Sequence, residues 1–110
     1  MSKEIKVLQL GEKDWREIYS IPSNLDYDFF EEFNSEKKNF YDITFIDKEL
    51  SDKEIEVLDE VVKSYTLFVL DDIFMSKSMK RFFNHRMGRF ISKNDIQAFF
   101  DTEIRNFFPD

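Results

Sequence analysis

Cysteine is absent from this 110-residue sequence, which excludes disulfide bonds, thiolate metal sites and a cysteine nucleophile. The only glycines are Gly11 and Gly88, too few for a glycine-rich phosphate loop or a GxGxxG turn. His85 is the only histidine, and no GxSxG motif supplies a serine for a triad that would use it. We therefore expect no catalytic residues and no cofactor in this chain alone, and we interpret His85 as a surface or capping residue.

Long hydrophobic runs are also missing. The longest mostly apolar run is Tyr65–Leu70, whereas a membrane-spanning helix needs about 20 such residues. The start of the chain has neither the apolar stretch nor the small-residue cleavage site of a secretory signal. These features predict a cytoplasmic protein that is not integral to a membrane, and they leave open a peripheral association with the inner face of the membrane.

Phenylalanine and charge are abundant. The 14 phenylalanines within a 42% hydrophobic composition predict one folded domain over residues 1–110. The net charge of −7 argues against nucleic acid as a partner, because phosphate backbones attract basic surfaces. Residues 1–40 carry 6 basic and 9 acidic side chains, residues 41–75 carry 3 and 10, and residues 76–110 carry 7 and 4. The carboxyl-terminal third is thus the only basic part of the chain.

Short apolar stretches alternate with helical patterns. Strands are predicted at Ile5–Leu10, near Asp26–Phe29, at Tyr41–Ile46 and at Tyr65–Leu70, and a short helix is expected after Phe29. The last of these strands is the most apolar and is expected at the centre of the sheet. The alternation predicts an α/β domain of three layers, with a small, mainly parallel sheet flanked by helices, as in flavodoxin-like and receiver domains.

Three further helices are predicted by caps and apolar stripes. The capping box Ser51-Asp52-Lys53-Glu54 begins the first, which is expected to run to about Ser64. Ser76 or Ser78 caps the second, expected over Lys77–Lys93 with no strand after it. A box-like start at 92–95 begins the third. The expected apolar stripes are Ile55, Leu58, Val61 and Val62; Met79, Phe82, Phe83, Phe90 and Ile91; and Ile96, Phe99, Phe100, Ile104 and Phe107.

Acidic residues follow two of the predicted strands, namely Asp47, Asp71 and Asp72. Ligands of open parallel sheets bind beyond the carboxyl ends of the strands, so these carboxylates could hold Mg²⁺ or accept a phosphoryl group. The run Tyr41–Asp47 resembles the third strand of receiver domains, although only Glu12 stands where receivers have an acidic pair. The alternatives are a degenerate receiver-like signalling domain and simple solvated turn formers or helix caps.

Six basic residues and no acidic one lie between Lys77 and Lys93. This segment is either a docking surface for an acidic partner, an anionic lipid face or RNA, or an ordinary amphipathic helix. In the second case its basic side balances the acidic middle of the chain. Trp15 is either an aromatic anchor for a partner or a lid on the sheet edge. The partner-contact candidates are therefore Trp15, Lys77, Lys80, Arg81, Arg86 and Arg89.

The opening segment Lys6-Val7-Leu8-Gln9-Leu10-Gly11, followed by Asp14-Trp15, Tyr19 and Ile21-Pro22, carries a family resemblance. It resembles the amino terminus of an accessory Sec system protein of Gram-positive bacteria. The resemblance implies a part in the export of serine-rich, glycosylated adhesins. Members of that family are longer and carry an α/β-hydrolase-like acetyltransferase part with a Ser/Asp/His triad, for which this sequence has no matching motif.

The resemblance therefore implies a noncatalytic amino-terminal domain, either cut from a longer protein or belonging to a short relative. Its expected partners are the other accessory Sec proteins or the glycosylated adhesin substrate. No catalytic, cofactor or metal residue is carried over to this chain.

Overall fold

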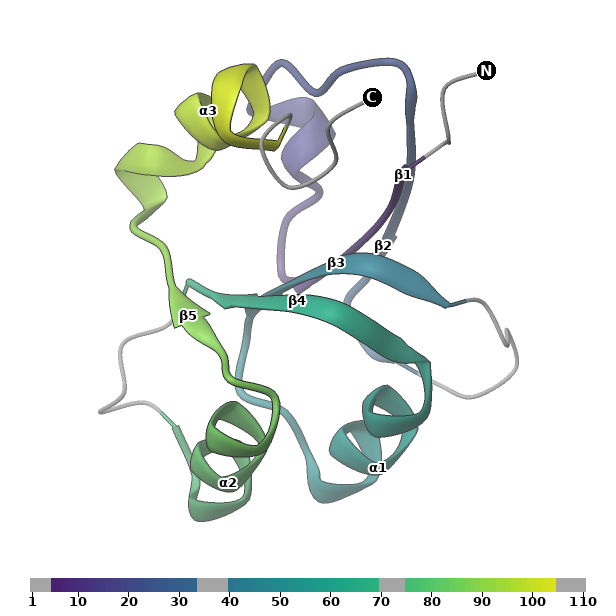
Figure 1. Ribbon diagram of the computed structural model, residues 1–110, viewed down its shortest axis with the longest axis vertical. Helices are drawn as coiled ribbons and strands as arrows, with labels where there is room; N and C mark the ends of the chain where they lie inside the picture. The colour runs from purple at the N-terminus through teal and green to yellow at the C-terminus, as the bar shows by residue number, and fades with distance from the viewer. Residues whose placement is uncertain (1–4, 34–39, 70–74, 105–110) are drawn as a thin grey trace.

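Five parallel strands form the centre of the computed structural model, which describes residues 5–33, 40–69 and 75–104 (Figure 1). The strands are β1 (Ile5–Gly11), β2 (Leu25–Phe30), β3 (Tyr41–Asp47), β4 (Val62–Phe68) and β5 (Arg89–Phe90). Their order across the sheet is β2-β1-β3-β4-β5, and every neighbouring pair is parallel. This is the 2-1-3-4-5 order of flavodoxin-like folds.

Helical segments cover both faces of the sheet (Figure 1). On one face lie α1 (Asp52–Val61) and α2 (Lys77–His85). On the other lie the short 3₁₀ helices η1 (Trp15–Glu17) and η3 (Lys93–Asp95), with α3 (Ile96–Ala98) and the π-helical turn η4 (Phe99–Glu103). The predicted three-layer α/β architecture is confirmed.

The centre of the sheet is β3, and the prediction that the strand near Tyr65–Leu70 would be central is wrong, since β4 lies between β3 and β5. The strand β3 shows why these sequences form a doubly covered sheet. Ile43 and Phe45 point into the apolar cluster beneath η1 and η4, while Ile46 points into the cluster beneath α1 and α2. All three side chains are fully buried. Because side chains alternate across a strand, a strand covered on both faces must place apolar residues on both of them, as β3 does with Ile43, Phe45 and Ile46.

The predicted capping box at the start of α1 is confirmed. The Ser51 hydroxyl accepts a hydrogen bond from the Glu54 amide at 3.2 Å, and the Glu54 carboxylate accepts one from the Ser51 amide at 3.1 Å. The helix ends at Val61, earlier than expected, and β4 follows directly at Val62. Local helical periodicity could not show this, because pairing of Val62 with Tyr41 of β3 takes that residue into the sheet.

The prediction of one continuous helix over Lys77–Lys93 is wrong. Ser76 caps α2 through the Met79 amide, but the helix ends at His85. Met87 then adopts a left-handed conformation with φ of 52°, and the Gly88 amide donates to the Phe83 carbonyl at 2.8 Å. A Cβ atom on Gly88 would lie within 2.8 Å of Phe83 and 2.9 Å of Phe68, so only glycine fits this passage.

After Gly88 the chain runs beside β4 as β5, a strand that the sequence did not predict. Phe90 and Ile91, expected on the helical stripe of α2, belong to this strand and to its exit. The short helix expected after Phe29 is also absent from the described residues 31–33, since β2 extends to Phe30.

The last predicted stripe is confirmed where the structure describes it. Ile96, Phe99, Phe100 and Ile104 are all buried against the sheet. Phe107, Asp71 and Asp72 lie outside the described residues. Within the described ranges, no helix combines the length and apolar character needed to cross a membrane.

Candidate functional site

The strand order creates a topological switch point between β1 and β3. The chain leaves β1 towards β2 and leaves β3 towards β4, so the two connections run in opposite directions along the sheet. Gly11 and Asp47 are register partners at the carboxyl ends of these strands. Open parallel sheets bind their ligands in the crevice that such a reversal leaves. The expected location of a site is therefore beside Gly11 and Asp47.

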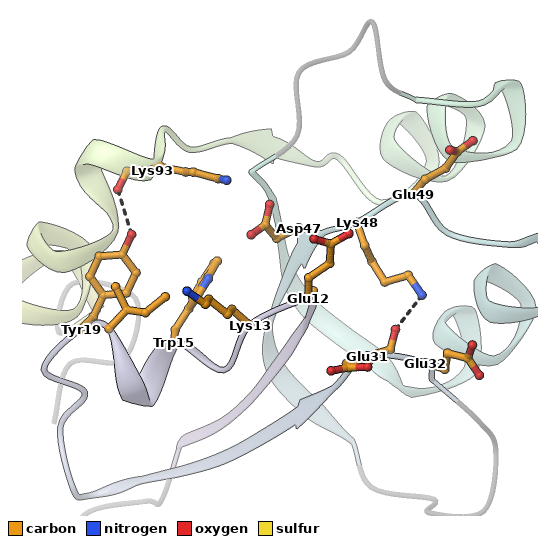
Figure 2. A pocket seen from close by; sticks show the side chains of 12 residues that line it. Glu12, Lys13, Trp15, Tyr19, Glu31, Glu32, Asp47, Lys48, Glu49 and Lys93 are labelled. Carbon is orange, nitrogen blue, oxygen red and sulfur yellow. Dashed lines mark hydrogen bonds between the residues drawn. The ribbon is translucent and has the colours of Figure 1, made fainter.

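A cleft of about 990 Å³ occupies this position (Figure 2). Its walls come from the segments that follow β1, β2 and β3, and from η3. The lining residues are Gly11, Glu12, Lys13, Trp15, Ile18, Tyr19, Glu31, Glu32, Asp47, Lys48, Glu49 and Lys93. Carboxylates outnumber ammonium groups in this lining, so the cleft is acidic overall.

Asp47 lies half-buried at the centre of the cleft (Figure 2). Burial raises the pKa of its carboxyl, and the nearby Glu12 carboxylate raises this pKa further. The positive charge of Lys93 and a hydrogen bond from Trp15 act against this rise without cancelling it. The structure thus places Glu12 near Asp47, as the receiver-like reading requires, and adds Lys93 from a segment 46 residues further along the chain.

Lys93 is a member of this cluster that the sequence analysis missed. Its position depends on β5, which brings η3 to the carboxyl end of the sheet. The Tyr19 hydroxyl, at 3.5 Å from the Lys93 carbonyl, links η3 to the wall formed after β1 (Figure 2). Since β5 had no sequence signal of its own, only the topology could reveal the approach of Lys93 to Asp47.

A buried polar side chain, Gln9, holds two residues that line the cleft, Lys13 and Trp15. Its amide oxygen accepts hydrogen bonds from the Trp15 backbone amide at 3.0 Å and from the Tyr27 hydroxyl. Its amide nitrogen donates to the Lys13 carbonyl at 2.7 Å. Burial raises the pKa of Tyr27, which keeps this phenol protonated and able to donate. Gln9 therefore fixes the loop that follows β1.

Trp15, a predicted partner contact, is only 3% exposed. Its indole packs edge-on against Phe45 and Tyr19, with ring centroids 5.1 and 6.1 Å away. Asp14 caps this turn by accepting from the Arg16 amide at 3.0 Å. The burial of the indole favours the lid interpretation over an exposed aromatic anchor.

The wall opposite Trp15 is held by a buried carboxylate. Glu54 accepts hydrogen bonds from the Phe33 amide at 3.1 Å and from the Lys48 ammonium at 2.9 Å (Lys48 also donates to the Glu31 carbonyl). Burial alone would raise the pKa of Glu54, but the amides of Ser51 and Phe33, together with Lys48, hold it below its usual range. Lys48 is thus committed to structure and is not a free cation of the cleft.

The five basic partner-contact candidates fall into three different environments. Arg86 pairs with Asp59 of α1 at 2.6 Å, and Arg81 lines a groove between α1 and α2. Lys77, Lys80 and Arg89 are exposed, and no carboxylate of the described residues pairs with them. The structure therefore does not bring the predicted set together as one continuous basic face.

His85 lies exposed on α2 and lines the same groove as Arg81. The surface position predicted for it is confirmed. Among the described residues, no three histidine or carboxylate side chains converge into a set that could hold a metal ion. The cleft instead offers carboxylates, ammonium groups and the phenol of Tyr19, which suit the binding of a polar ligand.

Neither the curated proteins nor the solved structures gave a match to the chain. A family model described as the accessory Sec system GspB-transporter matches residues 5–109, nearly the whole sequence. This match agrees with the resemblance carried by the segment from Lys6 to Pro22. The chain belongs to the accessory Sec system GspB-transporter family.

Proposed function

We propose that this chain is a noncatalytic interaction domain that serves the export of glycosylated, serine-rich adhesins in Gram-positive bacteria. Family membership supports its involvement in the accessory Sec system. The observation that carries the interaction role is the set of exposed cations on α2 and β5, namely Lys77, Lys80 and Arg89, which have no ion-pair partner within the described ranges. Cations that do not stabilise the fold are free to meet an acidic partner.

The expected partners are other accessory Sec components or the glycosylated adhesin, met on the cytoplasmic side of the membrane. A pull-down with each component tests this role. We expect capture by at least one of them, and we expect the combined charge reversals Lys77→Glu, Lys80→Glu and Arg89→Glu to weaken it. Lys53→Glu, an exposed reversal on α1, is the control and should leave capture unchanged. Failure of the wild-type chain with every component would refute the proposal.

A second candidate, a degenerate receiver-like signalling domain, is favoured by one observation. Asp47 lies at the carboxyl end of β3 under the opposing influences of Glu12 and Lys93. In this reading Asp47 and Glu12 would contact a divalent cation. Titration with Mg²⁺, followed by NMR, distinguishes the two candidates. Chemical shift changes centred on Asp47 and lost in Asp47→Asn would support the receiver-like role, and unchanged spectra would remove it.

A further inference from the structure

Among the described residues, no strand lies beyond the outer edge of β5. β5 is the last strand in the sheet order, and the Ile91 amide that follows it donates to the Phe68 carbonyl of β4 at 2.9 Å. Peptide groups point to alternate sides along a strand. The amide and carbonyl of Phe90, one residue before Ile91, therefore point away from β4 and towards the open edge of the sheet.

Met87 lies between α2 and β5 and has an unfavourable backbone conformation. Its side chain is 86% exposed, and its backbone has a φ of 52°, a conformation that suits glycine and disfavours residues with a side chain. Glycine at this position would preserve the end of α2 with less strain. An exposed apolar side chain in a strained backbone conformation does not stabilise the core. A contact with another molecule would explain why methionine occupies this position.

Phe90 extends the apolar surface that Met87 begins. Its ring stacks on Phe83 of α2, with a centroid separation of 4.7 Å and an interplanar angle of 28°, yet 52% of the residue remains exposed. The exposed side chains of Met87 and Phe90 stand on either side of Gly88 and Arg89 in the chain and are here called the apolar ridge. A strand that adds to a sheet edge bonds to the unpaired backbone groups of that edge, and its side chains cover the apolar side chains nearby.

The charged residues near the open edge of β5 indicate which kind of partner segment would bind there. Lys80 precedes Phe83 by three residues, so these two side chains share one side of α2. Arg81 lines the groove to α1 on a different side of the helix. Arg89 lies in β5 itself and is exposed. Exposed cations on α2 and on β5, the elements before and after Met87 in the chain, favour carboxylates in the partner.

We propose that the open edge of β5 accepts an extended acidic segment of a partner protein as an additional strand. The peptide groups of Phe90 would bond to the added backbone, an apolar side chain of the segment would cover the ridge of Met87 and Phe90, and its carboxylates would meet Lys80 and Arg89. This inference rests on the proposed interaction role, and it specifies that the partner contributes an extended acidic segment.

A blocked peptide of about ten residues that alternates glutamate and valine is the probe, since this length matches a long strand. Titration into the full chain, followed by NMR, should shift the amides of Phe90 and its neighbours. Lys80→Glu and Arg89→Glu should each weaken binding about fivefold or more, as expected for loss of one charge contact. Arg81→Glu is the matched control, because it makes the same charge change on the groove side of α2.

Met87→Gly separates binding from folding. The substitution should raise the melting temperature by relieving the strained backbone, while it weakens binding of the peptide. A purely structural role of Met87 would leave peptide affinity unchanged, which would contradict the proposal.

Four further results would overturn the inference. They are no binding of the peptide to the wild-type chain, equal weakening by Arg81→Glu, self-association of the chain that occupies β5, and binding to phosphatidylglycerol vesicles without binding to the peptide. If the peptide fails while an accessory Sec component is still captured, the proposed interaction role stands and only the assignment of β5 falls.

Discussion

At the scale of single residues, two buried threonines are the least satisfied groups of the core. Thr44 on β3 and Thr66 on β4 are register partners, and both are almost fully buried. Within the part of the chain that the structure describes, neither hydroxyl oxygen has a hydrogen-bond partner. An unsatisfied buried hydroxyl costs about 1–3 kcal/mol, and valine has nearly the same shape without that cost.

Thr44→Val is therefore expected to raise the free energy of unfolding by about 1 kcal/mol. Urea denaturation measures this change. Val7→Thr, which introduces a hydroxyl at another fully buried strand position, serves as the reverse control and should lower stability. A clear loss of stability in Thr44→Val would mean that the hydroxyl is satisfied after all.

Gly88 is a second residue whose environment allows a quantitative prediction. Gly88→Ala should destabilise the protein by about 1–3 kcal/mol, because its Cβ would clash with the rings of Phe83 and Phe68. Gly11→Ala is the matched control, since its closest contact is Asp47 at a milder 3.3 Å. Thermal unfolding compares the two. A larger loss for Gly11→Ala would contradict the packing described around β5.

At the scale of elements, the start of α1 joins separate parts of the chain through one carboxylate. Glu54 caps its own helix, binds the Phe33 amide after β2 and pairs with Lys48 after β3. Its folded-state pKa lies below the unfolded value of 4.5. The stabilisation that it contributes is therefore complete above pH 4.5 and is lost as the pH falls through the folded-state pKa.

Glu54→Gln should accordingly lower stability at pH 7 by about 1 kcal/mol or more, as expected for a lost cap contact. The difference from the wild type should shrink as the pH falls below 4.5. Denaturation across this pH range is the measurement. Glu56→Gln, at an exposed position of the same helix, is the control and should change little. A difference that does not depend on pH would show that the charge of Glu54 is not what matters.

At the scale of the whole molecule, the cleft at the switch point lowers the stability of the fold through the half-buried carboxyl group of Asp47. The folded-state pKa of Asp47 lies above its ordinary value of 3.8, because burial and Glu12 disfavour the charged form. The folded protein therefore binds this proton more tightly than the unfolded chain does. As the pH rises from 3.8 through the folded-state pKa, ionisation of Asp47 therefore destabilises the fold.

Asp47→Asn should thus be more stable than the wild type at pH 7, and the difference should vanish below pH 3.8. Chemical denaturation at the two pH values tests this expectation. Glu49→Gln, an exposed carboxylate of the same cleft, provides the control. A loss of stability in Asp47→Asn at neutral pH would instead show that its carboxylate supports the fold through Lys93 and Trp15.

Much of the architecture follows from local signals in the sequence. β1 and β3 have apolar β-branched runs, and the box at Ser51 and Glu54 begins α1 where expected. The alternation of these elements was enough to predict an α/β sheet with parallel strands. The family resemblance also lay in the sequence, in the residues from Lys6 to Pro22.

The candidate site was predictable only in part. The rule that strand ends meet at one edge of a parallel sheet placed Asp47 near Glu12. The rule gave no sign of Lys93, because that residue reaches the cleft through β5. It also could not separate Lys80 and Arg89 from Arg81 and Arg86, since a helix drawn through Gly88 would have kept all four cations on one element.

The sequence by itself determined the strand and helix alternation, the caps and the apolar stripes, because these depend on neighbours a few residues apart. Only the tertiary structure decided where α2 ends, that β5 forms, and which charged side chains share the cleft or the open edge. Those features depend on Gly88 packing against Phe68 and Phe83 and on the order of strands in the sheet. Contacts between segments far apart in the chain leave no local pattern to read.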